Sequence, residues 1–230
     1  MVSRTTRHND DASVPRDFVL LAGNWCQDYS AILLGYVWQA YDMLVANPPT
    51  AIDLEDLERS LTQVLEPRIH KVMTGYETFY VQHGPYERET KMPPPAQPPQ
   101  YDIAFVLYAD ERAMWPLEAK ILPTDGTIAD YVDDIKEQFL TCRYAPFSSE
   151  GAMLGYLLAG DADKAFDRIA AKLPCQLISH PRFAQRAHRI SHHSRKVPKG
   201  KKYPVEFACH HLMMSFLALR DLRPPRQPGN

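Results

Sequence analysis

Three charged residues interrupt two apolar segments of the chain, Tyr101 to Tyr108 and Ala113 to Leu122. They are Asp102, Glu118 and Lys120. Glu118 and Lys120 are two positions apart, so in a strand both side chains project from one face. Carboxylate oxygens are the ligands that Mg²⁺ and Mn²⁺ prefer, and a neighbouring lysine can orient a water or stabilise charge on phosphorus. These residue types therefore suit metal-assisted attack of water on a phosphodiester.

The two segments are joined by Ala109-Asp110-Glu111-Arg112, and this composition predicts a hairpin. A turn centred between Asp110 and Glu111 would place Asp102 opposite Ala119, next to the other two charged residues. The alternative interpretation is a salt-bridge cluster on the polar face of a hairpin.

The preceding residues predict two helices and a strand-rich run. The first helix fits Asp28 to Val45, and the second fits Asp53 to about His70, with Asp53 as its N-cap. Pro67 is expected to kink or end the second helix one turn early. Gly75 to Arg88 has the aromatic and turn residues of a strand region.

Glu58 lies on the apolar face of the second predicted helix. A carboxylate in that position either snorkels at the edge of the face or points at a buried partner. The sequence leaves both interpretations open.

After the hairpin, the pattern predicts more helices and then strands. We expect a helix over Thr127–Cys142, a helical stretch split by Gly151 and Gly155, a helix over Asp161–Leu173, a short strand over Cys175–Ser179, and a strand in the first half of Tyr203–Phe216. The order predicts an α/β fold, with a mixed central sheet flanked by helices on both faces.

Asp102, fifteen intervening residues and then Glu118-Ala119-Lys120 resemble the active-site signature of the PD-(D/E)xK nucleases, the restriction-endonuclease-like superfamily. The resemblance implies an αβββαβ core and Mg²⁺- or Mn²⁺-dependent hydrolysis of nucleic acid. It also implies that Asp102, Glu118 and the main-chain carbonyl of Ala119 hold the metal, while Lys120 orients the water. Glu58 would match the glutamate that many members contribute from the helix before the sheet. The proline in the family's name comes immediately before the aspartate, and in this chain Tyr101 occupies that position.

The charges are segregated along the chain, although the formal net charge is only −2. Residues 180–202 contain eight Lys and Arg and no acid. Such a segment suits a polyanion, because Lys and Arg displace the counterions of phosphates. The alternative is a loop folded against the acidic remainder. The expected nucleic-acid contacts are Arg195, Lys196, Lys199, Lys201 and Lys202.

Other candidate residues have simpler interpretations. The acidic run of Asp125, Asp130, Asp133, Asp134 and Glu137 suits the N-terminal end of a helix and solubility. The four cysteines read as buried reduced thiols. For the histidines at 188, 192, 193, 210 and 211 we favour phosphate contacts or packing over zinc. No serine-hydrolase, P-loop or dinucleotide-binding motif is present.

From these observations we expect one nuclease domain over residues 1–230. It would carry an N-terminal helical extension (1–50), a Pro-rich connection (93–100) and a basic segment (180–202). The expected function is a Mg²⁺-dependent endodeoxyribonuclease, the nuclease component of a restriction or anti-phage defence system. A catalytically silent nucleic-acid-binding or scaffold subunit and a DNA repair nuclease are the alternatives. We expect DNA as the partner and a cytoplasmic location without membrane insertion. The sequence does not decide whether the protein also binds a regulatory or ATPase subunit or forms a homodimer.

Overall fold

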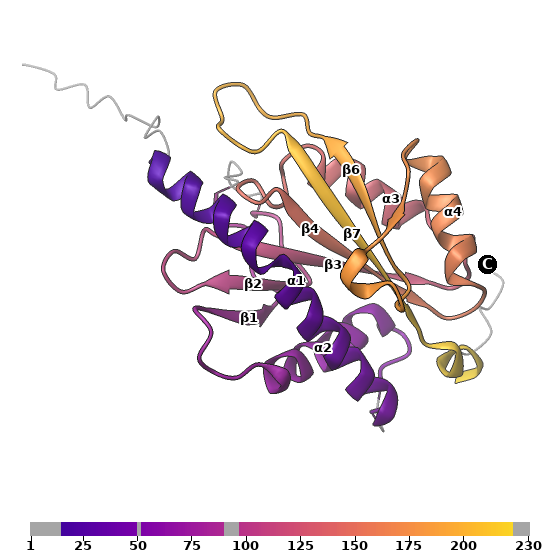
Figure 1. The fold of residues 1–230 in the computed structure, drawn as a ribbon. Helices are drawn as coiled ribbons and strands as arrows, with labels where there is room; N and C mark the ends of the chain where they lie inside the picture. Colours follow the sequence, from indigo (N-terminus) through magenta and orange to yellow (C-terminus); the bar gives the residue numbers. More distant parts are fainter. Residues whose placement is uncertain (1–14, 50–51, 90–96, 223–230) are drawn as a thin grey trace, which may run out of the picture.

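The computed structural model describes residues 15–49, 52–89 and 97–222 (Figure 1). Its strands form one mixed sheet in the order β1-β2-β3-β4-β7-β6-β5. β1, β2 and β3 are antiparallel, β3, β4 and β7 are parallel, and β7, β6 and β5 are antiparallel. The strands are β1 (Phe79–His83), β2 (Ile103–Leu107), β3 (Met114–Leu122), β4 (Glu150–Leu157), β5 (Ile178–Ser179), β6 (His188–Ser194) and β7 (Glu206–Ser215).

Helices cover both faces of the sheet, which confirms the predicted α/β class. In Figure 1, α1 and α2 lie in front of the sheet and α3 and α4 behind it. The helices are α1 (Arg16–Ala46), α2 (Leu57–Val72), α3 (Ala129–Asp134) with the π-helix η1 (Ile135–Phe139), α4 (Ala162–Lys172), and the 3₁₀ turns η2 (Pro181–Phe183) and η3 (Leu217–Leu222). In the described part of the chain, none of the helices combines the length and the apolarity needed to cross a membrane.

Helix α1 covers most of the predicted N-terminal helical extension and packs into the core of the protein. It begins at Arg16 instead of Asp28, because Phe18, Ala22 and Trp25 are already buried with the residues of β1 and β3. Gly23 lowers helix propensity by about 1 kcal/mol, and this burial outweighs the cost. The chain before residue 15 and residues 93–96 of the Pro-rich connection lie outside the described residues.

Helix α2 begins at Leu57, and Asp53 caps the turn before it by accepting a hydrogen bond from the Glu55 amide (2.9 Å). The predicted early end at Pro67 was wrong, because the helix continues to Val72. Pro67 lies on the exposed side of α2, as does Gln63, whose carbonyl loses its usual intrahelical partner. Water can therefore satisfy that carbonyl, and the helix continues past the proline.

The stretch with Gly151 and Gly155 is a central strand, β4, and the helical prediction there was wrong. β4 lies between the parallel strands β3 and β7, and the helices on either side of the sheet cover both of its faces (Figure 1), which explains its continuous apolar run. The two glycines leave room for neighbours. A Cβ at Gly151 would lie 2.8 Å from the Phe139 ring, and one at Gly155 would lie 2.4 Å from the sulfur of Met213.

The last third of the chain contains more strand than expected. β6 occupies His188–Ser194 inside the predicted basic loop, and β7 extends through most of Tyr203–Phe216. The helix expected over Thr127–Cys142 is shorter, since α3 passes into η1 and ends at Phe139. The predicted helix at Asp161 is confirmed, with the Asp161 carboxylate accepting from the Lys164 amide (3.0 Å).

Candidate active site

The carboxylates of Asp102 and Glu58 bind an edge of β3 that β2 leaves open. β2 begins at Ile103, opposite Leu117, so within the described part of the chain the later residues of β3 have no strand partner on that side. The Asp102 carboxylate accepts a hydrogen bond from the Ala119 amide (2.7 Å), and the Glu58 carboxylate accepts one from the Ile121 amide (2.8 Å). Two acidic side chains therefore replace the missing strand, and they meet on one stretch of β3.

The main-chain carbonyl of Ala119 faces the same edge, because the N–H and C=O of one strand residue point to the same side. The predicted hairpin is confirmed, but its register is one residue off. The loop is centred on Asp110, which places Ile103 opposite Leu117. Asp102 consequently approaches Glu118 instead of lying opposite Ala119.

Lys120 lies at the centre of the cluster and contacts three carboxylates. Its Nζ is 3.2 Å from Glu118, 3.4 Å from Glu58 and 3.0 Å from Asp134. The Glu118 side chain is only 9% exposed, and that of Lys120 is 19% exposed. These three carboxylates and that of Asp102, which accepts from the neighbouring Ala119 amide, form what we call the carboxylate cluster (Glu58, Asp102, Glu118 and Asp134).

Burial raises the pKa of Glu58, Asp102 and Glu118, and mutual repulsion adds to this. For Glu118 the pKa rises well above the ordinary value, with burial as the main cause and the charges of Asp102 and Asp134 as further causes. Burial raises the pKa of Asp102, and its hydrogen bond from Ala119 opposes the shift. Burial alone would lower the pKa of Lys120, but Glu118, Glu58 and Asp134 raise it, so this lysine is charged. The one positive charge of Lys120 therefore does not balance the four carboxylates of the cluster.

The donor set fits a hard divalent cation. One oxygen of Glu118, Oε2, is buried, and no group among the described residues forms a hydrogen bond with it. A buried, unpaired carboxylate oxygen is costly unless a proton or a cation neutralises the group. Within the described residues, however, no three His, Cys, Asp or Glu side chains are already arranged as a ligand set. In the present arrangement Lys120, and not a preformed cage, holds the carboxylates together.

The structure brings together five residues that the sequence singled out: Asp102, Glu118, Ala119, Lys120 and Glu58. Of the two interpretations of Glu58, the buried partner is correct. The sequence interpretation missed Asp134, which was assigned to solubility. Its signal lies in helical periodicity, because at about 100° per residue Asp134 is closer than the other acids of its run to the face of the buried Tyr131.

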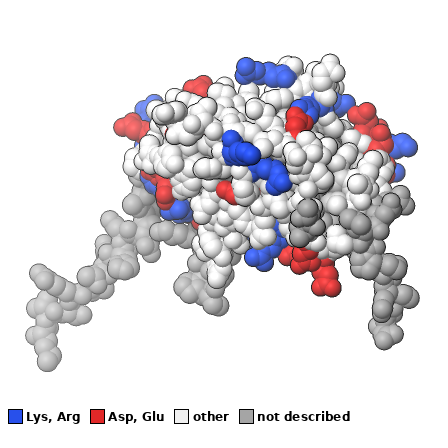
Figure 2. Space-filling view, turned by 90° about the horizontal axis from the view of Figure 1, so that it is seen from below, with Lys and Arg blue, Asp and Glu red and all other residues white. Residues whose placement is uncertain are grey.

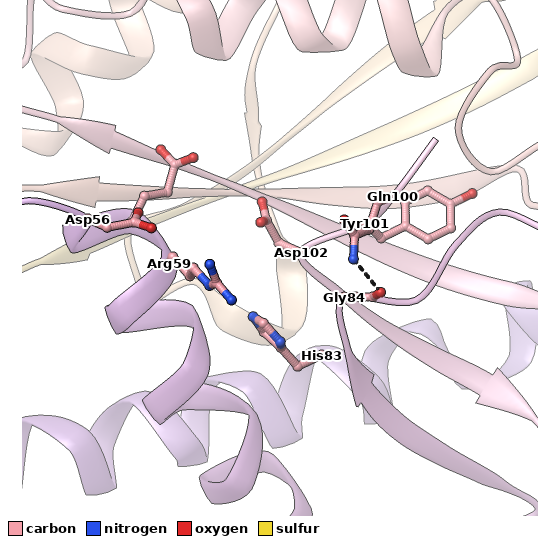
Figure 3. Close-up of a pocket in the computed structure, with 8 residues that line it drawn as sticks. Asp56, Arg59, His83, Gly84, Gln100, Tyr101 and Asp102 are labelled. Atoms are coloured by element: carbon pink, nitrogen blue, oxygen red, sulfur yellow. Dashed lines mark hydrogen bonds between the residues drawn. The ribbon is translucent and has the colours of Figure 1, made fainter. Parts of the chain in front are cut away.

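A pocket of about 310 Å³ opens beside the cluster. Glu58 and Asp102 line it together with residues from the start of α2, the end of β1 and the segment before β2 (Figure 3). The Gln100 amide forms part of the wall by donating to the Gly84 carbonyl (2.7 Å). The remaining lining residues are Asp56, Arg59, His83 and Tyr101.

The basic segment is not one continuous nucleic-acid surface. Arg195 is buried, and its guanidinium donates to the carbonyls of Pro204 (2.8 and 2.9 Å) and Ala145 (2.8 Å), so its assignment as a DNA contact was wrong. Lys201 pairs with Glu89 at 3.2 Å. On the face shown in Figure 2, basic and acidic side chains are scattered and mixed. The exposed lysines of the predicted set are Lys196, Lys199, Lys201 and Lys202.

Three of the candidate histidines, His188, His210 and His211, are buried, and the first pair is linked through hydrogen bonds. The Trp38 indole donates to His188 Nδ1 (3.2 Å), His188 Nε2 lies 3.2 Å from His210 Nδ1, and His210 Nε2 lies 3.3 Å from Glu150. Burial lowers the pKa of His188 to about 2, so the ring stays neutral. The packing interpretation therefore holds for this pair, and burial excludes phosphate contacts by His188. The cysteines are free thiols, three of them buried and Cys175 half-buried.

Comparisons of the chain with protein-family models, with curated proteins and with solved structures each found no match. The case for a function therefore depends on the site itself.

Proposed function

We propose that this protein is a divalent-metal-dependent nuclease that hydrolyses DNA phosphodiesters at the carboxylate cluster. The observation that carries the proposal is the convergence of Glu58, Asp102 and Glu118 on Lys120 at the open edge of β3. The unpaired Oε2 of Glu118 and the raised pKa values of these carboxylates favour a bound cation.

Asp102, Glu118 and the carbonyl of Ala119 would hold Mg²⁺ or Mn²⁺, with Glu58 as a further oxygen donor. When bound, such a cation activates water and neutralises charge on a phosphoryl oxygen. Lys120 places an ammonium beside the same carboxylates, where it orients the attacking water and stabilises charge in the transition state. Asp134 acts as a positioning residue, because it holds the Lys120 amine from the side of α3.

The order of elements supports the resemblance to PD-(D/E)xK nucleases. From α2 to β4 the chain runs helix, three strands, helix, strand, with Asp102 directly before β2 and Glu118 and Lys120 on β3. We propose a restriction-endonuclease-like core on this basis. A role in restriction or anti-phage defence, with a partner that supplies specificity or activation, is part of the same proposal.

One observation favours a second candidate, a catalytically silent nucleic-acid-binding subunit. The amine of Lys120 already occupies the space between three carboxylates, and a lysine can stabilise such a cluster without any metal. This candidate predicts duplex binding without cleavage.

A cleavage assay separates the two candidates. Supercoiled plasmid is incubated with the wild type, Asp102→Ala, Glu118→Gln and Lys120→Met in Mg²⁺, in Mn²⁺ and in EDTA. Lys172→Met, an exposed lysine at the end of α4, is the control. We expect cleavage by the wild type and the control with metal only, and a loss of roughly 100-fold or more in each site variant. Binding without cleavage by the wild type, or cleavage that survives EDTA, contradicts the nuclease proposal.

A further inference from the structure

The pocket beside the carboxylate cluster carries both signs of charge. Asp56, Glu58 and Asp102 contribute carboxylates, while Arg59 and His83 contribute nitrogen donors. Figure 3 shows the Arg59 guanidinium directed toward the His83 ring, with Asp102 near them. His83 pairs with Ile103 across β1 and β2, which keeps it one residue from Asp102.

Arg59 has no carboxylate partner within 4.0 Å among the described residues. This sets it apart from Arg186 and Arg189, which pair with Asp42 and Asp163. Arg59 is exposed, and the Asp102 and Glu58 carboxylates that line the same pocket accept hydrogen bonds from the amides of β3. Its five N–H donors are therefore available to a ligand that enters the pocket.

His83 adds hydrogen bonding without adding charge. Burial lowers its pKa, the Arg59 charge lowers it further, and Glu66 opposes the shift. The ring is consequently neutral at neutral pH and can donate one N–H to an oxygen.

We propose that Arg59 and His83 form a subsite for a backbone phosphate of the nucleic acid next to the phosphate that is cleaved. This inference rests on the proposed function and specifies how the substrate is held. A guanidinium matches two phosphate oxygens in a bidentate arrangement, and its charge offsets the repulsion between DNA and the nearby carboxylates. The neighbouring phosphate would thus fix the register of the strand before any cation completes the site.

The test measures binding without catalysis. A fluorescent duplex is titrated in EDTA by anisotropy, at several salt concentrations, with the wild type, Arg59→Ala, Arg59→Lys and His83→Gln. Lys71→Ala is the matched control, because Lys71 is an exposed cation on the same helix outside the pocket. Inorganic phosphate serves as competitor, and thermal unfolding verifies that each variant folds.

We expect Arg59→Ala to weaken duplex binding roughly 5- to 20-fold and to reduce the log-log salt slope by about 1, with partial rescue in Arg59→Lys. Lys71→Ala should stay within about twofold of the wild type. Equal effects of Arg59→Ala and Lys71→Ala overturn the subsite, as does a wild type that binds no duplex. Arg59-dependent binding without metal-dependent cleavage would sustain the subsite and refute only the nuclease proposal. If inorganic phosphate binds at Arg59 but Arg59→Ala leaves the duplex affinity unchanged, the ligand is free phosphate and the assignment to a backbone phosphate is wrong.

Discussion

Replacing Lys120 by methionine keeps most of the side-chain volume and removes the ammonium shared by Glu58, Glu118 and Asp134. Removing one member of a buried ion pair costs roughly 3–5 kcal/mol. The side chains of Glu118, Asp134 and Glu58 are 9%, 23% and 34% exposed, so water screens part of the lost charge interaction. We therefore expect the free energy of unfolding to fall by about 3 kcal/mol near neutral pH without metal. For a chain of this size that corresponds to a decrease in Tm of about 6–12 °C.

The loss should depend on pH with a definite sign. Burial raises the pKa of Glu58, Asp102 and Glu118, so the folded protein holds protons that the unfolded chain has released. Stability from such groups is full below their unfolded pKa values of about 4 and falls as pH rises toward the folded values. Without the Lys120 charge, the pKa values of these carboxylates in the folded protein rise further. The deficit of Lys120→Met should therefore be small at pH 4.5 and large at pH 7.5.

Urea unfolding of the wild type and Lys120→Met at these two pH values, in EDTA, measures this difference, with Lys172→Met as control. Mn²⁺ should then stabilise Lys120→Met more than the wild type, because the cation supplies the missing charge. An equal deficit at both pH values, or no deficit at all, would refute the assignment of Lys120 as the cation that balances the cluster.

Three further predictions follow from the same contacts. Asp134→Asn should lower kcat for cleavage roughly 10-fold and leave duplex affinity within about twofold, since Asp134 positions Lys120 without touching substrate; an unchanged kcat would remove Asp134 from the site. Arg195→Met should lower the free energy of unfolding by about 2 kcal/mol, because buried carbonyls lose their donors, and should leave the salt slope of DNA binding unchanged; a changed slope with normal stability would return Arg195 to the interface. The double variant Lys199→Ala/Lys202→Ala should reduce that slope by up to about 2 and leave stability unchanged, as measured by anisotropy and urea unfolding; an unchanged slope would place the DNA path elsewhere.

The sequence was enough to predict the hairpin that carries the site. Asp102, Glu118 and Lys120 stand out because charge inside an apolar strand needs a partner, and the structure supplies those partners. Glu58 could be singled out for the same reason on α2. The register was missed by one residue because the loop is centred on Asp110, which accepts hydrogen bonds from the Arg112 and Ala113 amides. Local turn chemistry of this kind is not visible in composition alone.

Contacts between distant segments explain the remaining errors. Asp134 reaches Lys120 only because α3 and η1 pack on the face of the sheet from which Lys120 projects. This contact depends on tertiary packing, which the local sequence pattern does not predict. β4 resembled a broken helix because its glycines accommodate Phe139 and Met213, which belong to other elements. Arg195 shows the limit of charge counting. A basic residue in a basic run can still be buried against backbone carbonyls.

Titration of Mn²⁺ into the metal-free protein, followed by electron paramagnetic resonance of the free ion, tests the central claim most directly. The carboxylate cluster should bind Mn²⁺, with an affinity that rises with pH as Glu58, Asp102 and Glu118, whose pKa values burial raises, lose their protons. Glu118→Gln should abolish this binding, whereas Lys172→Met should not change it. Absence of Mn²⁺ binding by the wild type, or equal binding by Glu118→Gln, would show that Lys120 alone balances these carboxylates and that the cluster is not a metal site.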